Sequence, residues 1–194
     1  MVDLSYPEQA AAIINKLSGG FKPKLAMILG SGLGEVAKAI EKPITISYKD
    51  LPKFMVTNIA GHAKQLHLGM LHGVPVICLE GRTHLYEGDG AVESIITVIR
   101  TLKLLGVEIL FTTNAVGSLR TEVRPGSLVA VKDHINFMWQ NPLVGPNDEK
   151  YGERFVSMDD AYDSALRTKL FATAKRLNVP MVDGVFIGTI GPTF

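Results

Sequence analysis

Two short, continuous apolar runs constrain the fold of this chain more than any other feature. Residues 25–29 read Leu-Ala-Met-Ile-Leu and residues 74–79 read Val-Pro-Val-Ile-Cys-Leu, and neither run alternates with polar positions. A strand that faces solvent on one side alternates, whereas a strand covered on both faces is apolar throughout. Both runs therefore predict buried strands of a sheet that is flanked by helices.

Around these runs, predicted strands alternate with predicted helices. The clearest helix occupies residues 92–102, where apolar side chains recur every three or four positions before Gly106. This order predicts an α/β fold with a mixed, largely parallel sheet, in a single domain spanning residues 1–194. Further helices are expected at 7–17, near 35 and at 164–176, further strands at 45–48, 65–70, 108–113, 127–131 and 184–190, and a long loop at 141–154.

Composition argues against several kinds of partner. The 194 residues carry a net charge of +1, with 46% apolar and 20% charged residues. No strong field therefore attracts nucleic acid or an anionic membrane surface. No apolar run approaches the roughly 18 residues of a membrane span, and the N-terminus lacks the basic and apolar regions of a signal peptide.

The cysteine and histidine content points away from disulfides and metals. Cys78 is the only cysteine, so no internal disulfide can form, in agreement with a cytoplasmic location. The five histidines are scattered without paired spacing, so we expect no metal site. His67 and His72 have no sequence neighbours that suggest a function, and we interpret both as structural or exposed.

A cluster of hydrogen-bonding side chains follows the second apolar run. Arg82, His84 and Tyr86 lie within five residues of one another, directly after the predicted strand. A guanidinium offers a planar fork of donors that matches an oxyanion, and ligands of α/β sheets bind at the C-terminal ends of strands. The cluster favours a bound anion, with phosphate as the first choice. The alternative is a surface loop with an incidental Arg–Glu pair.

The first apolar run is followed by a glycine-rich turn, Gly-Ser-Gly-Leu-Gly at residues 30–34. Its main-chain N–H groups could approach an anion, and a helix beginning near Glu35 would add partial positive charge. The spacing differs from the dinucleotide and Walker motifs, although Asp50 stands about 20 residues on, where a dinucleotide site has an acid. NAD binding and a purely structural turn remain alternatives.

Three other features are weaker candidates. His62 lies in a polar loop before a strand, where a lone histidine is usually exposed. Residues 113–118 end a strand with small side chains, which would let a flat ligand approach the main chain. A triad of Ser31, His84 and Asp133 lacks the GxSxG elbow, so hydrolysis is disfavoured.

Four short segments stand in order along the chain, and they read ILGSGLG at 28–34, GHA at 61–63, GRTHLYEG at 81–88 and TNA at 113–115. In this order they resemble the trimeric purine nucleoside phosphorylases. Each motif is short, but the ordered set is specific, and further segments at 117–120, 133–136 and 191–194 extend the match over nearly the whole chain. The amino-acid sequence at residues 118–136 and 152–155 is most similar to the bacterial xanthosine phosphorylase branch.

The resemblance implies reversible phosphorolysis. A purine ribonucleoside or deoxyribonucleoside and phosphate would give the free base and the sugar 1-phosphate. Phosphate held beneath C1′ would stabilise the oxocarbenium-like sugar and attack it, so positioning and electrostatics would dominate catalysis. The resemblance also implies a cytoplasmic homo-oligomer, a trimer or a multiple of one. It would need no cofactor besides the co-substrate phosphate and bind neither nucleic acid nor membrane.

The resemblance also assigns site residues, position by position. His84 and Asn114 would be catalytic, Asn114 by shaping the strand exit. Phe155 would reach the sugar of a neighbouring subunit. Phosphate would contact Ser31, His62, Arg82, His84 and the main-chain N–H of Ala115, and ribose and base would contact Tyr86, Val116, Gly117, Phe155 and Phe194.

Three departures from the family pattern bear on these expectations. Lys64 stands where the family often has glycine, which affects the charge and flexibility of the His62 loop. Val116 and Ser118 replace smaller residues of the animal enzymes, which bears on base choice. The chain stops at Phe194, where the family continues with a Glu-Thr pair and further protein. We therefore expect a chain that is incomplete at its C-terminus, lacks the carboxylate that grips the purine, and shows little turnover alone.

Two other functions remain open at this point. One is a methylthioadenosine phosphorylase-like enzyme. Enzymes of that kind share the architecture but have different sequences in the glycine loop and in the His-Arg segments. The other is a non-catalytic remnant that binds phosphate or self-associates. Phosphorolysis of inosine, guanosine and xanthosine would separate these interpretations.

Overall fold

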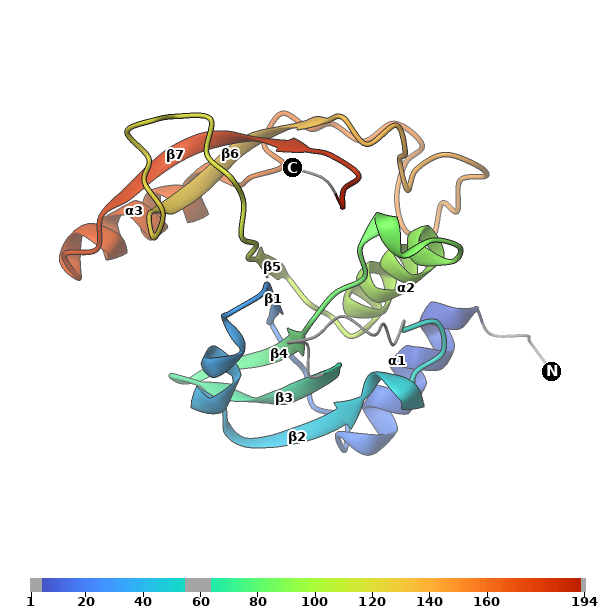
Figure 1. Cartoon of the computed structure of the whole chain (residues 1–194). Helices are drawn as coiled ribbons and strands as arrows, with labels where there is room; N and C mark the ends of the chain where they lie inside the picture. Colours follow the sequence, from blue (N-terminus) through green and yellow to red (C-terminus); the bar gives the residue numbers. More distant parts are fainter. Residues whose placement is uncertain (1–4, 55–63, 193–194) are drawn as a thin grey trace. The chain divides into compact units, whose positions relative to one another are not determined.

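The computed structural model describes residues 5–54 and 64–192 of the chain. The chain divides into two units, Met1–Ala115 and Val116–Phe194, called unit 1 and unit 2 below (Figure 1). Each unit has its own sheet. The expected single domain over residues 1–194 stays a prediction.

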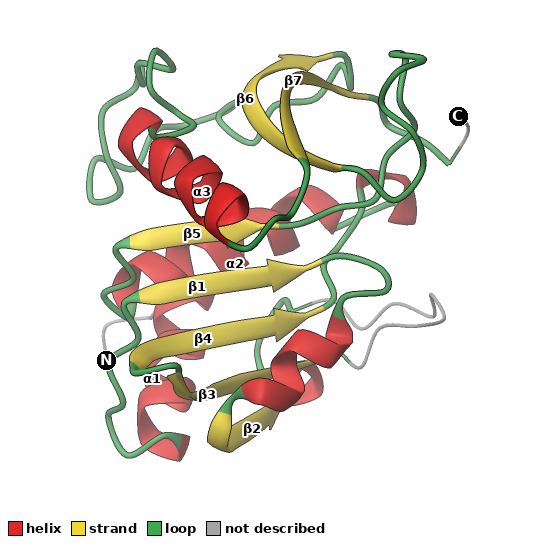
Figure 2. Cartoon of the chain, turned by 90° about the vertical axis from the view of Figure 1, so that its left-hand side faces the viewer, coloured by secondary structure: helices red, strands yellow, loops and turns green. Residues whose placement is uncertain are grey.

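Unit 1 is built on a five-stranded sheet in the order β2-β3-β4-β1-β5. Strand β1 is parallel to β4 and to β5, whereas the β2–β3 and β3–β4 pairs are antiparallel. Figure 2 shows β1 and β4 side by side with their arrowheads at the same end. The predicted mixed α/β sheet is confirmed. The strands are β1 Leu25–Leu29, β2 Glu41–Ser47, β3 Gln65–Leu71, β4 Val74–Glu80 and β5 Ile109–Thr112.

Helices cover both faces of this sheet (Figure 2). The helices α1 (Tyr6–Leu17) and α2 (Ala91–Leu104) pack against each other on one face and enclose the main apolar core. The 3₁₀ helix η1 (Gly34–Ala39) covers the other face with a smaller cluster. Two more 3₁₀ turns, η2 (Tyr48–Asp50) and η3 (Leu85–Glu87), follow β2 and β4.

The two apolar runs form the buried strands that the sequence predicted. Ile77 and Leu79 of β4 face the α1–α2 side and Val76 and Cys78 face η1, and all four are at most 2% exposed. Each large apolar side chain buried in this way contributes roughly 1.5–3 kcal/mol to folding. Strand β4, whose end carries part of the candidate site, is therefore held in the interior of unit 1.

The described part of unit 2, residues 116–192, contains two parallel strands and one helix. Strand β6 (Leu128–Asn136) pairs with β7 (Met181–Gly188), and α3 (Ser164–Arg176) lies in the crossover between them. Oδ2 of Asp183 forms an ion pair with Nζ of Lys132 at 3.0 Å and lies 3.8 Å from Nη2 of Arg167 on α3. Lys132, by hydrogen bond and charge, holds the pKa of Asp183 below its usual range.

Within residues 5–54 and 64–192, no helix is both long enough and apolar enough to cross a bilayer. The same residues include no group of three metal-ligating side chains close enough to hold an ion.

Candidate functional site

Three strand ends meet at one edge of the unit 1 sheet. In the parallel register, Leu29 of β1 lies opposite Glu80 of β4, and Ile28 lies opposite Thr112 of β5. The glycine turn, the Arg82 segment and the segment that begins at Thr113 therefore leave the sheet together. In open α/β sheets, this carboxyl edge is where ligands bind.

Thr113 joins the glycine turn to Arg82. The main-chain N–H of Gly30 donates to the Thr113 hydroxyl at 2.9 Å, and Nη1 of Arg82 donates to the Thr113 carbonyl oxygen at 2.9 Å. A Cβ at position 30 would lie 2.6 Å from that carbonyl oxygen and 2.9 Å from Cα of Asn114. Glycine at position 30 is therefore what lets the two strand exits come together.

The Arg82 guanidinium is partly buried, and burial lowers its pKa from the usual value. No carboxylate among residues 5–54 and 64–192 forms an ion pair with it. Even partial burial of a cation without an acidic partner costs free energy, which an approaching anion offsets. The environment of Arg82 therefore suits a bound oxyanion.

His84 is held by a neighbouring carboxylate. Oε1 of Glu87 accepts from the main-chain N–H of His84 at 2.6 Å and contacts Nδ1 of the ring at 2.8 Å. The Tyr86 ring stacks on the imidazole at 5.0 Å between centroids and is 42% exposed. Glu87 thereby fixes the ring orientation, and the stacked Tyr86 remains accessible to a ligand.

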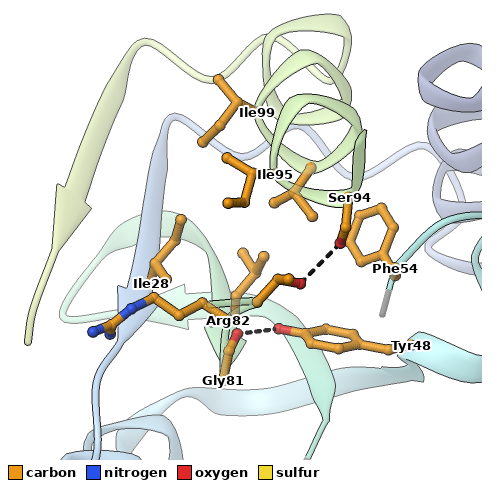
Figure 3. Close-up of a pocket in the computed structure, with 11 residues that line it drawn as sticks. Ile28, Tyr48, Phe54, Gly81, Arg82, Ser94, Ile95 and Ile99 are labelled. Atoms are coloured by element: carbon orange, nitrogen blue, oxygen red, sulfur yellow. Dashed lines mark hydrogen bonds between the residues drawn. The ribbon is translucent and has the colours of Figure 1, made fainter. Parts of the chain in front are cut away.

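An apolar cavity of about 180 Å³ lies behind the Arg82 segment, between the sheet and α2 (Figure 3). On its rim, Tyr48 donates to the Gly81 carbonyl at 2.9 Å, and the hydroxyls of Thr83 and Ser94 are 2.9 Å apart. Burial raises the pKa of the Tyr48 phenol, so this donor stays protonated. Both neighbours of Arg82 are thus anchored, while its guanidinium extends away from Ser94 and Phe54.

The structure brings part of the predicted site together. Ser31 is exposed in the glycine turn, and Arg82, His84, Tyr86, Asn114 and Ala115 follow the ends of β4 and β5 at the same edge of unit 1. The other predicted residues are not placed with them. Val116, Gly117 and Phe155 belong to unit 2, so their expected contacts stay predictions, and His62 and Phe194 lie outside the described residues.

The glycine turn differs in one respect from the expectation. The element that follows it, η1, is a six-residue 3₁₀ helix, which offers a smaller dipole than a long α-helix. The main-chain N–H groups of the turn itself are therefore its main means of attracting an anion.

Two residues with clear structural roles were missed in the sequence. Glu87 could have been found from its spacing, because an acid three residues after His84 has the pattern of a capping box. Thr113 could not have been found in this way. Its partners Gly30 and Arg82 are 83 and 31 positions away, and only the strand pairing brings them together.

Comparison with known proteins identifies the family. The model of the phosphorylase superfamily matches residues 24–194. Purine nucleoside phosphorylase 1 of Bacillus subtilis (strain 168) is 47% identical over 187 residues, which cover 96% of this chain and 68% of that protein. The purine nucleoside phosphorylase of Rattus norvegicus is 39% identical over 89% of this chain and 61% of its own length.

Solved structures agree with this assignment. A purine nucleoside phosphorylase from Schistosoma mansoni in complex with inosine is 35% identical and superposes with a TM-score of 0.91, covering 99% of this chain and 68% of that one. Isoform 2 from the same organism, in complex with cytosine and ribose-1-phosphate, is 36% identical with a TM-score of 0.90. The chain therefore belongs to the phosphorylase superfamily, among the purine nucleoside phosphorylases.

Proposed function

We propose that this chain catalyses reversible phosphorolysis of purine nucleosides to the free base and ribose 1-phosphate or deoxyribose 1-phosphate, with little turnover when the chain is alone. The observation that carries the proposal is the environment of Arg82. Its partly buried guanidinium bonds the Thr113 carbonyl beside the glycine turn and forms no ion pair within the described residues. Phosphate supplies the negative charge that this position accepts.

In the proposed reaction, the donors act by placing phosphate beneath C1′ of the sugar. Arg82, the Ser31 hydroxyl and the main-chain N–H groups of the turn and of Ala115 would hold its oxygens. His84, with Nδ1 engaged by Glu87, would turn its other ring nitrogen toward the anion. As the glycosidic bond to C1′ breaks, its electron pair leaves with the base, and the phosphate charge stabilises the developing oxocarbenium ion. A phosphate oxygen then forms the new bond to C1′.

The roles of the remaining predicted residues are part of the same proposal. Tyr86 would contact the ribose, a role that its exposure supports. Asn114 would shape the strand exit, and Val116 and Gly117 would line the base pocket. Phe155 is 89% exposed, as expected of a side chain that reaches a neighbouring subunit. His62 would lie near phosphate, and Phe194 would stack near the base.

The finer assignments concern the base and the assembly. We propose a preference for xanthosine, inosine or guanosine. The resemblance of residues 118–136 and 152–155 to the xanthosine phosphorylase branch supports this preference. A Schistosoma mansoni relative was solved with inosine and also with adenosine, so adenosine belongs among the substrates to test. We further propose a homotrimer or a multiple of one, which sedimentation can test directly.

The test combines turnover with binding. Release of base from inosine, guanosine, xanthosine and adenosine is measured with and without inorganic phosphate, and phosphate binding is measured by calorimetry. Phosphate-dependent release of base supports the proposal. Phosphate binding without any turnover would instead favour the non-catalytic interpretation, and release of base that does not require phosphate would contradict the proposal.

A further inference from the structure

A row of polar side chains crosses the sheet face of unit 1 that is covered by η1. Nδ1 of His67 on β3 lies 2.9 Å from the Thr45 hydroxyl on β2, and Nε2 of His67 lies 3.0 Å from Oε2 of Glu80 on β4. Nε2 of Gln65 donates to the same Oε2 at 2.9 Å. Two donors from β3 therefore converge on one carboxylate oxygen at the end of β4.

These groups lie in an apolar setting. The side chains of His67 and Glu80 are 10% and 15% exposed, and Cys78, directly opposite His67 in the register, is fully buried. A carboxylate in such a place needs hydrogen-bond donors to balance the loss of water. Nε2 of His67 can supply one whether the ring is neutral or protonated, because the Thr45 hydroxyl can pair with Nδ1 in the neutral form.

The other oxygen of Glu80 faces the glycine turn. A Cβ built on Gly34 would lie 3.3 Å from Oε1 of Glu80, so this oxygen lies beside Gly34, the last residue of the turn. Glu80 is also the cross-strand partner of Leu29, the residue directly before the turn. The carboxylate thus lies between its donors on β3 and Gly34.

From this arrangement we propose that Gln65 and His67 hold the Glu80 carboxylate back from the glycine turn and so leave the N–H groups of the turn to phosphate. Glu80 and His67 are positioning residues in this proposal, which rests on the proposed function of the turn. Without His67, the carboxylate keeps only the Gln65 donor and, in this proposal, turns toward Gly34 and the main-chain N–H groups of the turn. It then competes with phosphate for the same donors and repels it by charge.

The choice of substitutions separates the two bonds of His67. Asparagine places its amide near the Nδ1 position and keeps a partner for Thr45 but cannot reach Glu80, whereas glutamine reaches the Nε2 position and keeps the donor to Glu80. His72 provides the matched control, since it is exposed in the β3–β4 turn with φ of 48°, which asparagine tolerates. Glu80→Gln keeps the shape and removes the charge.

Inorganic phosphate is titrated into the full chain and each variant by calorimetry, with thermal unfolding recorded in parallel. We expect His67→Asn to weaken phosphate binding about fivefold to tenfold, as for loss of one hydrogen bond to a charged group. His67→Gln and His72→Asn should stay within about twofold of the wild type. Adding Glu80→Gln to His67→Asn should restore binding, because a neutral amide does not compete as an anion.

The outcomes are distinct. Two results overturn the inference and leave His67 with a structural role only. One is equal weakening of phosphate binding by His67→Asn and His67→Gln, and the other is failure of Glu80→Gln to restore binding to His67→Asn. If His67→Asn does not fold, Glu80→Gln alone decides, because the inference requires it to bind phosphate at least as tightly as the wild type. A wild-type chain that does not bind phosphate contradicts the proposed function itself, whatever the variants do.

Discussion

Arg82 and Thr113, 31 positions apart in the chain, are joined by a 2.9 Å hydrogen bond from the guanidinium to the main-chain oxygen. The same Thr113 receives the Gly30 N–H on its hydroxyl. The cation and the glycine turn therefore share one anchor. This link gives the anion site a defined geometry within a single compact unit and leads directly to the first two predictions.

Arg82→Lys should raise the KM for phosphate about tenfold, with a smaller change in the KM for the nucleoside. Lysine keeps the charge, but it cannot bond Thr113 and phosphate with one planar fork. A tenfold change corresponds to about 1.4 kcal/mol. Initial rates at varied phosphate and fixed nucleoside measure the effect. Arg124→Lys, at an exposed position in unit 2, is the control, and equal KM values in both variants would contradict the role of Arg82.

Gly30→Ala should lower the free energy of unfolding by about 1–3 kcal/mol, the usual cost of forcing a methyl group into a packed site. The new Cβ would meet main-chain atoms of Thr113 and Asn114 at 2.6 and 2.9 Å, and main-chain atoms cannot move aside alone. Urea unfolding measures the loss. Gly117→Ala, where the added Cβ meets nothing within 4 Å, should cost much less.

Glu87→Ala should weaken phosphate use through His84. The Glu87 carboxylate holds both the main-chain N–H and the ring of His84, so its loss frees the imidazole to rotate. We expect a rise of about threefold to tenfold in the KM for phosphate, as for loss of one bond to a charged group. The exposed acid Glu149 supplies the matched control, Glu149→Ala. An unchanged KM for phosphate in the Glu87 variant would show that His84 does not need this support.

Lys64→Gly should stabilise the chain by about 0.5–1 kcal/mol, because glycine adopts a left-handed conformation without the penalty of a Cβ. Lys64 has φ of 56°, and its main-chain groups join Tyr48 and Glu80 by hydrogen bonds of 3.0 and 3.1 Å. Thermal unfolding checks the gain. Lys49→Gly, within η2, should have the opposite sign, and a loss of stability at position 64 would mean that the lysine side chain contributes more than its backbone costs.

Stability should fall with pH above about 9 because of Cys78. Burial, with a smaller contribution from the Glu80 charge, raises the pKa of this thiol from 9.0 to about 12. Between these values the unfolded chain has released the proton and the folded chain retains it, so unfolding is favoured as pH rises, by at most about 1.4 kcal/mol per pH unit. Urea unfolding of the wild type and Cys78→Ala from pH 8 to 10 measures the difference, and parallel pH profiles would contradict it.

Apolar periodicity in the sequence predicted most helices and strands well. It did not predict the end of a strand whose side chains are polar. The helix expected at 164–176 has the bounds of α3, and the strand expected at 25–29 is β1. In unit 2, β6 continues to Asn136 beyond the expected end at residue 131. Its later positions, which include Lys132, Asp133 and His134, are polar, and pairing with β7 rather than apolar burial holds them in the strand.

The candidate site was predictable by residue type but not by partner. Arg82, His84 and the glycine turn were recognisable because strand ends in α/β sheets gather ligands. His67, interpreted as structural or exposed, proved to be buried between Thr45 and Glu80. Its partners lie across strands, and a one-residue change of register would point the histidine to the opposite face. Sequence spacing alone does not contain that register.

The shared anchor at Thr113 has a thermodynamic consequence for ligand capture. Because the arginine and the glycine turn are tied to one residue, their relative arrangement is ordered when the chain folds. The conformational entropy of these donors is therefore lost when the chain folds. Binding of the anion then does not carry the entropic cost of ordering them. Binding of phosphate should therefore leave the main-chain order parameters of Gly30 and Thr113 nearly unchanged. This is the behaviour of a preorganised site and not of a loop that closes over its ligand.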